Sequence, residues 1–185
     1  RSPVLTGPGA CGSFLILEDG IPVRPNGFCN VNGLLETQTE TASSLEVIRG
    51  PASARYGSNA MHGVINVVSK SIEDINTISS NVGPNKYTNF KSSIGDSENW
   101  RINTLFSSDD GFRKESGYDQ QKLHLKNKFI FYKSDTTFNL RLTNLNQETA
   151  GYILGKDIYK DKKESEKNLN PEAYRDAYSL KSNFK

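Results

Sequence analysis

The sequence predicts two unlike parts: a mixed α/β region of mostly short strands over residues 1–70, then antiparallel transmembrane β-barrel strands over residues 71–185. Three observations predict this division. The pattern changes after Lys70 from Gly/Pro-punctuated short runs to long polar/apolar alternation, which is the two-residue period of strands with unlike faces. The later strands are long enough to cross a bilayer, and the links between them alternate between short and long.

Composition agrees with strands that are apolar on one face only. Hydrophobic residues make up 35% of the 185 residues and charged residues 24%, with a net charge of +2. No apolar run approaches the roughly 18 residues of a transmembrane helix. No Lys/Arg block stands free of acidic residues, which argues against nucleic-acid binding.

The first part reads as short elements separated by turns. Residues 1–13 are rich in Gly and Pro and predict a loop. Short strands are expected at 14–17 and 21–23, on either side of the Glu18-Asp19-Gly20 turn signal. One helical turn is expected at 32–36, a strand ending at Val47-Ile48, a possible short helix within 52–60, and a strand at 61–69.

About six strands are expected in the second part, most of them about 9–12 residues long, whereas soluble sandwiches more often use strands of about five or six residues. Their predicted ranges are 75–83, 86–95, 99–107, 121–133, 136–145 and 175–185.

The strand at 121–133 shows how the two faces are assigned. Leu123, Leu125, Phe129 and Phe131 alternate with Lys122, His124, Lys126 and Lys128. A lysine on the lipid side of the bilayer midplane costs roughly 2–4 kcal/mol. We therefore expect the basic side chains to face a barrel lumen and the apolar ones to face lipid. A soluble sheet with Leu and Phe facing a core explains the alternation equally well, but not the strand lengths or the links.

The links carry an independent signal. Those at 95–99 and 133–135 are short, and those at 107–120 and 146–174 are longer. Outer-membrane barrels have short periplasmic turns and long extracellular loops, so the two kinds must alternate. The short link at 83–86 is an exception to this rule.

Cys11 and Cys29 are the two cysteines of the chain. They are either free thiols or, in an oxidising compartment, a disulfide across a small loop. A zinc site is not expected, because four ligands are needed and neither histidine is near in sequence.

The segment SSLEVIRGPASARYGSNAMHGVINVVSK at 43–70 resembles the plug signature of TonB-dependent outer-membrane receptors. Upstream, the strand–Asp-Gly–strand pattern at 15–23 resembles the stretch that precedes this signature in the family. The signature residues that we single out are Glu46, Arg49, Gly50, Pro51, Gly57, Gly63 and Asn66.

The resemblance implies a plug domain followed by the first strands of a 22-stranded plugged barrel, of which about six are present. The signal peptide, the TonB-contacting box and the first half of the plug would then precede Arg1, and most of the barrel would follow Lys185. It also implies energised uptake of a scarce ligand such as a ferric siderophore, haem or cobalamin across the outer membrane of a Gram-negative bacterium. The implied partners are the TonB–ExbB–ExbD complex, the lipid of the outer membrane and the ligand, with no catalysis, cofactor or resident metal.

Several residues are candidates for ligand contact or for plug–barrel contact. The expected ligand-binding residues are Arg24, Asn26, Phe28, Arg55, Tyr56, His62 and Tyr152. His62 could instead be an exposed side chain without a role in binding. Arg49 is either paired with a carboxylate or exposed to solvent. The inner-face basic residues would suit an anionic ligand or would pair with carboxylates of the plug and loops.

A second class of function stays open from the residues alone: a soluble or surface β-rich binding or adhesion module without transport. The sequence shows no Ser/His/Asp or paired-carboxylate arrangement, so an enzyme is not expected.

Overall fold

A computed structural model describes residues 14–24, 33–151 and 172–184. The chain divides into two compact units, Arg1–Ser71 and Ile72–Lys185. Each unit is described by itself.

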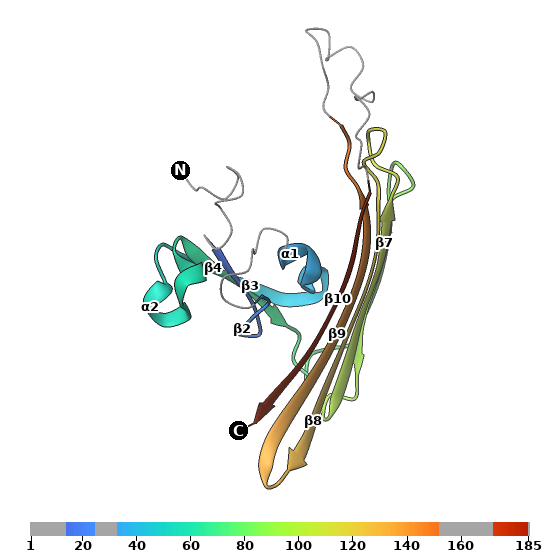
Figure 1. Ribbon diagram of the computed structural model, residues 1–185. Coiled ribbons are helices and arrows are strands. Elements are labelled where there is room, and N and C mark those ends of the chain that lie inside the picture. The colour runs from blue at the N-terminus through green and yellow to red at the C-terminus, as the bar shows by residue number, and fades with distance from the viewer. Residues whose placement is uncertain (1–13, 25–32, 152–171, 185) are drawn as a thin grey trace. The chain divides into compact units, whose positions relative to one another are not determined.

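The first unit is a four-stranded sheet with short helical turns (Figure 1). The sheet order is β2-β1-β4-β3, with β1 parallel to β4 and the other pairs antiparallel. Its elements are β1 (Phe14–Glu18), β2 (Ile21–Pro22), α1 (Gly33–Glu36), the 3-10 turn η3 (Thr39–Thr41), β3 (Ala42–Arg49), α2 (Ser53–Tyr56), η4 (Ser58–Ala60) and β4 (Gly63–Ser69). The short strands and helical turns expected in the described part of this region are confirmed.

The core of this unit is small and lies under the two central strands. Leu15 and Leu17 of β1 and Val64 of β4 are almost fully buried and pack with Ala60 of η4. Tyr56 of α2 packs against this cluster. The apolar β1 and β4 run parallel and are covered, as buried parallel strands usually are.

The second unit is a single six-stranded antiparallel sheet in which every strand pairs with the next along the chain (Figure 1). Its strands are β5 (Thr77–Val82), β6 (Thr88–Gly95), β7 (Trp100–Asp109), β8 (Tyr118–Phe131), β9 (Ser134–Glu148) and β10 (Glu172–Phe184). This meander confirms the predicted antiparallel sheet and its strand order.

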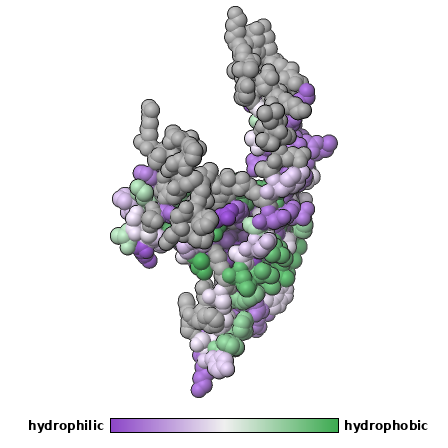
Figure 2. Space-filling view, in the orientation of Figure 1, coloured by the Kyte–Doolittle hydropathy of each residue, from purple (hydrophilic) through white to green (hydrophobic). Residues whose placement is uncertain are grey.

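The two faces of the six-stranded sheet differ as the alternation predicts. The face that we call the polar face carries buried Arg101, Asn103, Lys122, His124, Asn139 and Arg141. The face that we call the apolar face carries exposed Phe90, Ile94, Phe106, Phe129, Leu142, Tyr178 and Leu180. Figure 2 shows hydrophobic side chains gathered over the sheet, with hydrophilic ones nearer its ends. This is the reverse of a soluble sheet, in which the polar face is wet and the apolar face is buried.

The strands extend further toward the long links than the sequence predicts. β8 begins at Tyr118 rather than at 121, and β9 ends at Glu148 rather than at 145. The added residues are polar on both faces, so no alternation marks them, but their backbones remain paired. The turn between β8 and β9 is also tighter than the predicted 133–135, because Tyr132 and Lys133 both adopt positive φ, at 48° and 66°. Two residues of this kind form the short turn that suits the twist of a hairpin.

No helix in the described ranges is both long and apolar enough to span a membrane.

Candidate functional site

Asn66 joins three parts of the four-stranded sheet. Its side-chain nitrogen donates to Glu46 Oε2 at 2.8 Å on the neighbouring β3. Its side-chain oxygen accepts from the backbone N–H of Gly20 at 2.9 Å, in the turn between β1 and β2. Asp19 in the same turn accepts from the backbone N–H of Ser69 at 2.8 Å. The signature residues Glu46 and Asn66 therefore hold the Asp-Gly turn against β3 and β4.

Gly63 lies where the backbones come closest. It has φ of 156°, and a Cβ built on it would meet the carbonyl oxygen of Ile48 at 2.6 Å. Real Cβ contacts are longer, so only glycine fits without a shift of the backbone. Gly50 and Gly57 have φ of 95° and 87°. Proline has no backbone N–H to donate. Because Pro51 lies beyond the end of β3 at Arg49, no hydrogen bond between strands is lost there.

Three predicted ligand-binding residues belong to the segment that connects the end of β3 to the start of β4. Arg55 and Tyr56 belong to α2, which follows β3, and the Arg55 guanidinium lies 5.2 Å from the centre of the Tyr56 ring. His62 directly precedes β4, is exposed, and its ring centre lies 6.2 Å from that of Phe14. We call Arg55, Tyr56 and His62 the α2 cluster.

Arg24 lies apart from the α2 cluster. It forms an ion pair with Glu36 of α1. α1 comes before the start of β3 and α2 comes after its end, so the two helices lie at opposite ends of this strand. The predicted ligand residues Asn26, Phe28 and Tyr152, and the cysteines Cys11 and Cys29, lie outside the described residues.

Arg49 is exposed at the end of β3, and within the described residues it forms no ion pair. The pairing of Arg49 with a carboxylate of the barrel wall stays a prediction.

His124 is fully buried on the polar face between two carboxamides from neighbouring strands. The His124 Nε2 lies 3.1 Å from Asn139 Oδ1, and Nδ1 lies 3.4 Å from Asn103 Nδ2. An amide oxygen only accepts and an amide nitrogen only donates. Nε2 of His124 therefore faces an acceptor and Nδ1 faces a donor.

Arg101 is also fully buried, and its guanidinium holds backbone carbonyls of the segment between the two sheets. It donates to the carbonyl oxygens of Ile72 at 2.9 Å, of Asp74 and of Ile75 at 3.5 Å, and to Ser93 Oγ at 2.7 Å. Asn76, which follows Ile75, exchanges two hydrogen bonds with the backbone of Gly95, at 3.1 and 2.8 Å. Arg101 is thus engaged by backbone oxygens, and we call residues 72–76 the connector.

The turns at the two ends of the six-stranded sheet are fixed by carboxylates. Asp96 accepts from the backbone N–H groups of Glu98, Asn99 and Trp100 at 2.7–3.0 Å. These bonds, led by the one from Trp100, lower the pKa of Asp96 to about 2. At the opposite end Lys86 and Asp110 form an ion pair at 2.7 Å, and this carboxylate raises the pKa of the Lys86 ammonium.

The described residues contain no group of three or more His, Cys, Asp or Glu side chains that could hold a metal ion. Two features of the six-stranded sheet escaped the sequence reasoning. One is the run of buried carboxamides and hydroxyls between the basic residues of the polar face, namely Asn89, Ser93, Asn103, Ser107 and Asn139. The other is a set of polar residues on the apolar face, where Gln121, Asn144 and Asp176 lie side by side through the register. Strand parity was the signal that could have found both.

Known proteins resemble both units of the chain. The family model described as the TonB-dependent Receptor Plug Domain matches residues 2–64. Among solved structures, the crystal structure of the siderophore receptor PirA from Pseudomonas aeruginosa has a similar fold, with a TM-score of 0.52 and 22% sequence identity. The match covers 94% of this chain and 30% of that receptor.

The PirA match thus spans both sheets, whereas the family model covers the first. Residues 2–64 of this chain are therefore a plug domain of the TonB-dependent receptor family, followed by an antiparallel β-sheet.

Proposed function

We propose that this chain is part of a TonB-dependent receptor that imports a scarce ligand across the outer membrane of a Gram-negative bacterium. The observation that carries the proposal is the reversed sheet that follows the plug domain, with basic residues on its buried face and aromatic and aliphatic residues on its exposed face. Lipid is the medium in which an exposed apolar face of this size is stable.

The lengths of the strands suit a bilayer. β7, β8 and β9 have 10, 14 and 15 residues, and a tilted strand needs about 9–11 residues to cross the hydrocarbon layer. β5 and β10 form the two edges of the sheet. Open edges are not stable in lipid, so further strands of the complete protein would close a barrel of about 22 strands.

In such a receptor the TonB–ExbB–ExbD complex would act on the plug and open a path for the ligand to the periplasm. This proposal comes from the family of the plug domain. The chain would bind and pass its ligand without changing it chemically, and it would need no cofactor.

A ferric siderophore is the first ligand class to test, and haem and cobalamin are the alternatives. On the plug, the α2 cluster offers an exposed guanidinium, a phenol ring and an imidazole that could meet an anionic chelate. Arg101 is engaged by carbonyl oxygens, so the basic side chains of the polar face are not all available to a ligand. This favours the interpretation that the polar face has a structural role.

The test is uptake by a strain that lacks the gene and is complemented with the complete protein. Under iron limitation, uptake of a panel of labelled ferric siderophores, haem and cobalamin should be restored for one ligand class, and only when TonB is present. Replacing both Arg55 and His62 with Ala should lower that uptake, whereas Ser44→Ala at the other end of β3 should not. Failure to restore uptake of any compound would argue for another role.

Solubility separates this proposal from a soluble or surface binding module. The complete protein should need detergent to stay in solution once it leaves the membrane. A compact monomer in buffer alone, with Leu123, Phe129 and Leu140 in a sealed core, would contradict the receptor proposal.

A further inference from the structure

The connector, residues 72–76, is attached to the six-stranded sheet by Arg101 of β7. This side chain is fully buried, and it donates to three carbonyl oxygens of the connector, those of Ile72 at 2.9 Å, of Asp74, and of Ile75 at 3.5 Å. It also donates to Ser93 Oγ of β6 at 2.7 Å. A guanidinium group is planar and carries five N–H donors, so one side chain can hold several carbonyl groups together.

Release of the connector would take these acceptors away from the buried Arg101 side chain. A buried charge is stable only when it is paired or hydrogen-bonded, because burial removes its hydration. The three carbonyl groups share one guanidinium, so their bonds to it would be lost together when the connector moves away. We therefore expect the attachment to yield in one step and not residue by residue.

Asn76 attaches the other end of the connector to β6. Its side-chain nitrogen donates to the carbonyl oxygen of Gly95 at 3.1 Å, and its side-chain oxygen accepts from the backbone N–H of Gly95 at 2.8 Å. β5 begins with the next residue, Thr77. At the first position of the connector, the Ile72 side chain is buried. Both ends of the connector are thus fixed.

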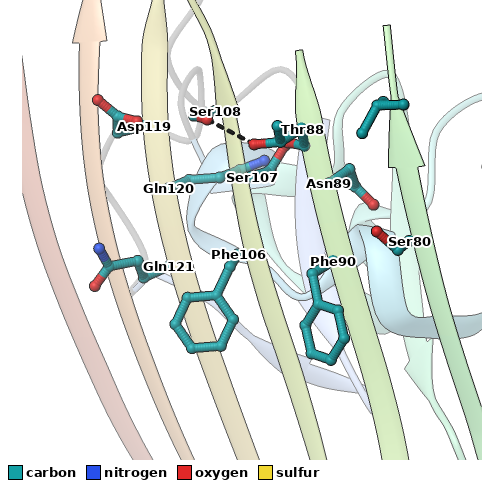
Figure 3. A pocket seen from close by; sticks show the side chains of 11 residues that line it. Ser80, Thr88, Asn89, Phe90, Phe106, Ser107, Ser108, Asp119, Gln120 and Gln121 are labelled. Atoms are coloured by element: carbon teal, nitrogen blue, oxygen red, sulfur yellow. Dashed lines mark hydrogen bonds between the residues drawn. The ribbon is translucent and has the colours of Figure 1, made fainter. Parts of the chain in front are cut away.

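The strands that receive the connector are joined to one another by backbone and side-chain contacts. All six residues of β5 pair with β6, and all eight residues of β6 pair with β7. Figure 3, a close view of a pocket on these strands, shows the hydrogen bond of 2.8 Å between Thr88 of β6 and Ser108 of β7. Phe90 and Phe106 of the same two strands lie side by side, with ring centres 6.5 Å apart. A load on the connector would therefore pass into strands that support one another.

On the other side of the connector, the last strand of the plug ends at a hydrogen-bonded residue. Ser69 is the last residue of β4, and Asp19 accepts hydrogen bonds from its backbone N–H at 2.8 Å and from its hydroxyl at 2.8 Å. Only Lys70 and Ser71 lie between Ser69 and Ile72. An extended chain spans at most about 3.6 Å per residue, so the end of β4 can move no more than about 11 Å from Ile72 while the connector stays attached. A longer movement requires the plug to unfold or the connector to detach.

We propose that Arg101 and Asn76 make the connector a mechanical stop, so that a pull on the plug opens it up to Ser69 and leaves residues 72–76 on the sheet. The inference rests on the proposed function, because it needs a barrel that holds the sheet while the plug is pulled. The order follows from the geometry of the bonds. β3 and β4 are antiparallel, and Ala42 pairs with Ser69 at the end of β4 that leads to the connector. A pull on the start of β3 therefore separates this ladder one pair at a time, whereas the bonds of the connector to Arg101 must break together.

Single-molecule force spectroscopy on the complete protein in a supported bilayer tests this stop. The pulling handle is attached at Ser44→Cys near the start of β3, in a background that carries Cys11→Ser and Cys29→Ser. The measured quantity is the length of chain released at the last stop before the strands of the sheet open. With the native connector it should correspond to about 28 residues, or roughly 100 Å, from the handle to Ile72. In Arg101→Gln the stop should move by about four residues, or roughly 14 Å, to Asn76, and adding Asn76→Ala should move it on to β5. A general loss of stability would lower the forces without moving the stop.

Lys128→Gln is the matched control, because it removes an exposed base from the same face of the sheet, two residues beyond the register partner of Arg101. It should keep the stop at Ile72. If Arg101→Gln does not fold, Arg101→Lys gives a second reading, because an ammonium group keeps the charge but cannot span three carbonyl groups. The force at which the stop at Ile72 yields should then fall.

A last stop at β5 with the native connector would overturn the inference and leave the receptor proposal in place. A stop that Arg101→Gln does not move, or a yield force that Arg101→Lys does not lower, would have the same meaning. A complete protein that does not insert into the bilayer would overturn the proposed function instead.

Discussion

At the scale of single residues, Asn66 shows how the plug signature stabilises the fold. One carboxamide satisfies Glu46 on β3 and the backbone N–H of Gly20 in the β1–β2 turn. Replacing it with Leu removes both bonds and leaves both partners to water. We expect Asn66→Leu to lower the free energy of unfolding by about 1–2 kcal/mol. Hydrogen exchange of the β3, β4 and turn amides should become faster.

Ser44→Ala is a control on the same sheet, because Ser44 is an exposed strand residue with no side-chain hydrogen bond among the described residues. Its exchange rates should match the wild type. If these amides exchange as slowly in Asn66→Leu as in the wild type, Asn66 does not stabilise the turn.

Gly63 gives a second prediction at this scale. Gly63→Ala places a methyl group 2.6 Å from the Ile48 carbonyl oxygen at a φ of 156°. We expect a loss of about 1–3 kcal/mol in stability, the usual range for strained backbone, measured from the unfolding midpoint in denaturant. Gly83→Ala is a matched control in a loop, where the nearest atoms are those of the Tyr87 side chain at 3.2 Å. If Gly63→Ala is as stable as Gly83→Ala, the backbone of β3 can move to accommodate the added methyl group.

Single residues also show where sequence reasoning stops. The parity of Lys122 and Leu123 placed them correctly on opposite faces, because one alternation decides both. Nothing in the sequence pairs Arg24 with Glu36 or places Asn76 against Gly95, since these contacts depend on how distant segments pack. The carboxamides around His124 were missed because Asn and Ser give a weak signal beside Lys and Arg.

At the scale of elements, the turn between β6 and β7 depends on one carboxylate. Hydrogen bonds to the ionised form of Asp96 lower its pKa to about 2, below the value of about 4 expected in an unfolded chain. A lowered pKa means that Asp96 contributes its full stabilisation above about pH 4 and loses it as the pH falls through about 2. The carboxyl carbon of Asp96 should titrate in NMR with a midpoint near 2.

In Asp96→Asn this part of the acid dependence should disappear. The turn should be less ordered, because the amide carries no negative charge and its nitrogen cannot accept the hydrogen bond that Asn99 Nδ2 donates to Asp96 Oδ2. A titration midpoint near 4 in the wild type would refute the role of the backbone bonds.

The connector is a second element that depends on one side chain. Arg101 donates to three of its carbonyl oxygens, and hydrogen bonds of Asn76 with Gly95 join its end to β6. Arg101→Gln cannot reach several carbonyl groups at once, so the connector should detach from the sheet. Trypsin should then cut faster after Lys70, by about tenfold if about 1.4 kcal/mol of local stability is lost.

Arg113→Gln in the β7–β8 link serves as the control, because it removes an exposed arginine elsewhere in the chain. Cleavage that is equally slow in Arg101→Gln and in this control would show that other contacts hold the connector.

Element order and type were predictable, whereas element ends were not. The strands after residue 100 were found from alternation, which exists only where one face is apolar. Toward the long links the alternation stops beyond Gln121 of β8 and Leu145 of β9, so the first residues of β8 and the last residues of β9 follow from backbone pairing alone.

At the scale of the whole molecule, the plug and the six-stranded sheet bury different kinds of side chain. The plug packs Leu15, Leu17 and Val64 into a small core, as a soluble domain does. The six-stranded sheet instead exposes its apolar face and keeps charged groups such as Arg101 and Lys122 buried. Both arrangements support the proposal of a receptor with an aqueous interior and a lipid exterior.

This contrast predicts that the size of a mutational effect depends on the face. Leu140→Arg introduces a charge on the apolar face in the middle of β9, where register pairs it with Leu125 and Leu180. It should destabilise the complete protein in lipid by about 2–4 kcal/mol. Thr137→Arg, three residues away on the same strand but on the polar face, should cost much less.

Folding into vesicles at a series of urea concentrations measures both variants against the wild type. The order of the two variants decides the result, because both add the same side chain to the same strand. If Thr137→Arg were the more damaging variant, the apolar face could not be the one in contact with lipid. The receptor proposal would then fail.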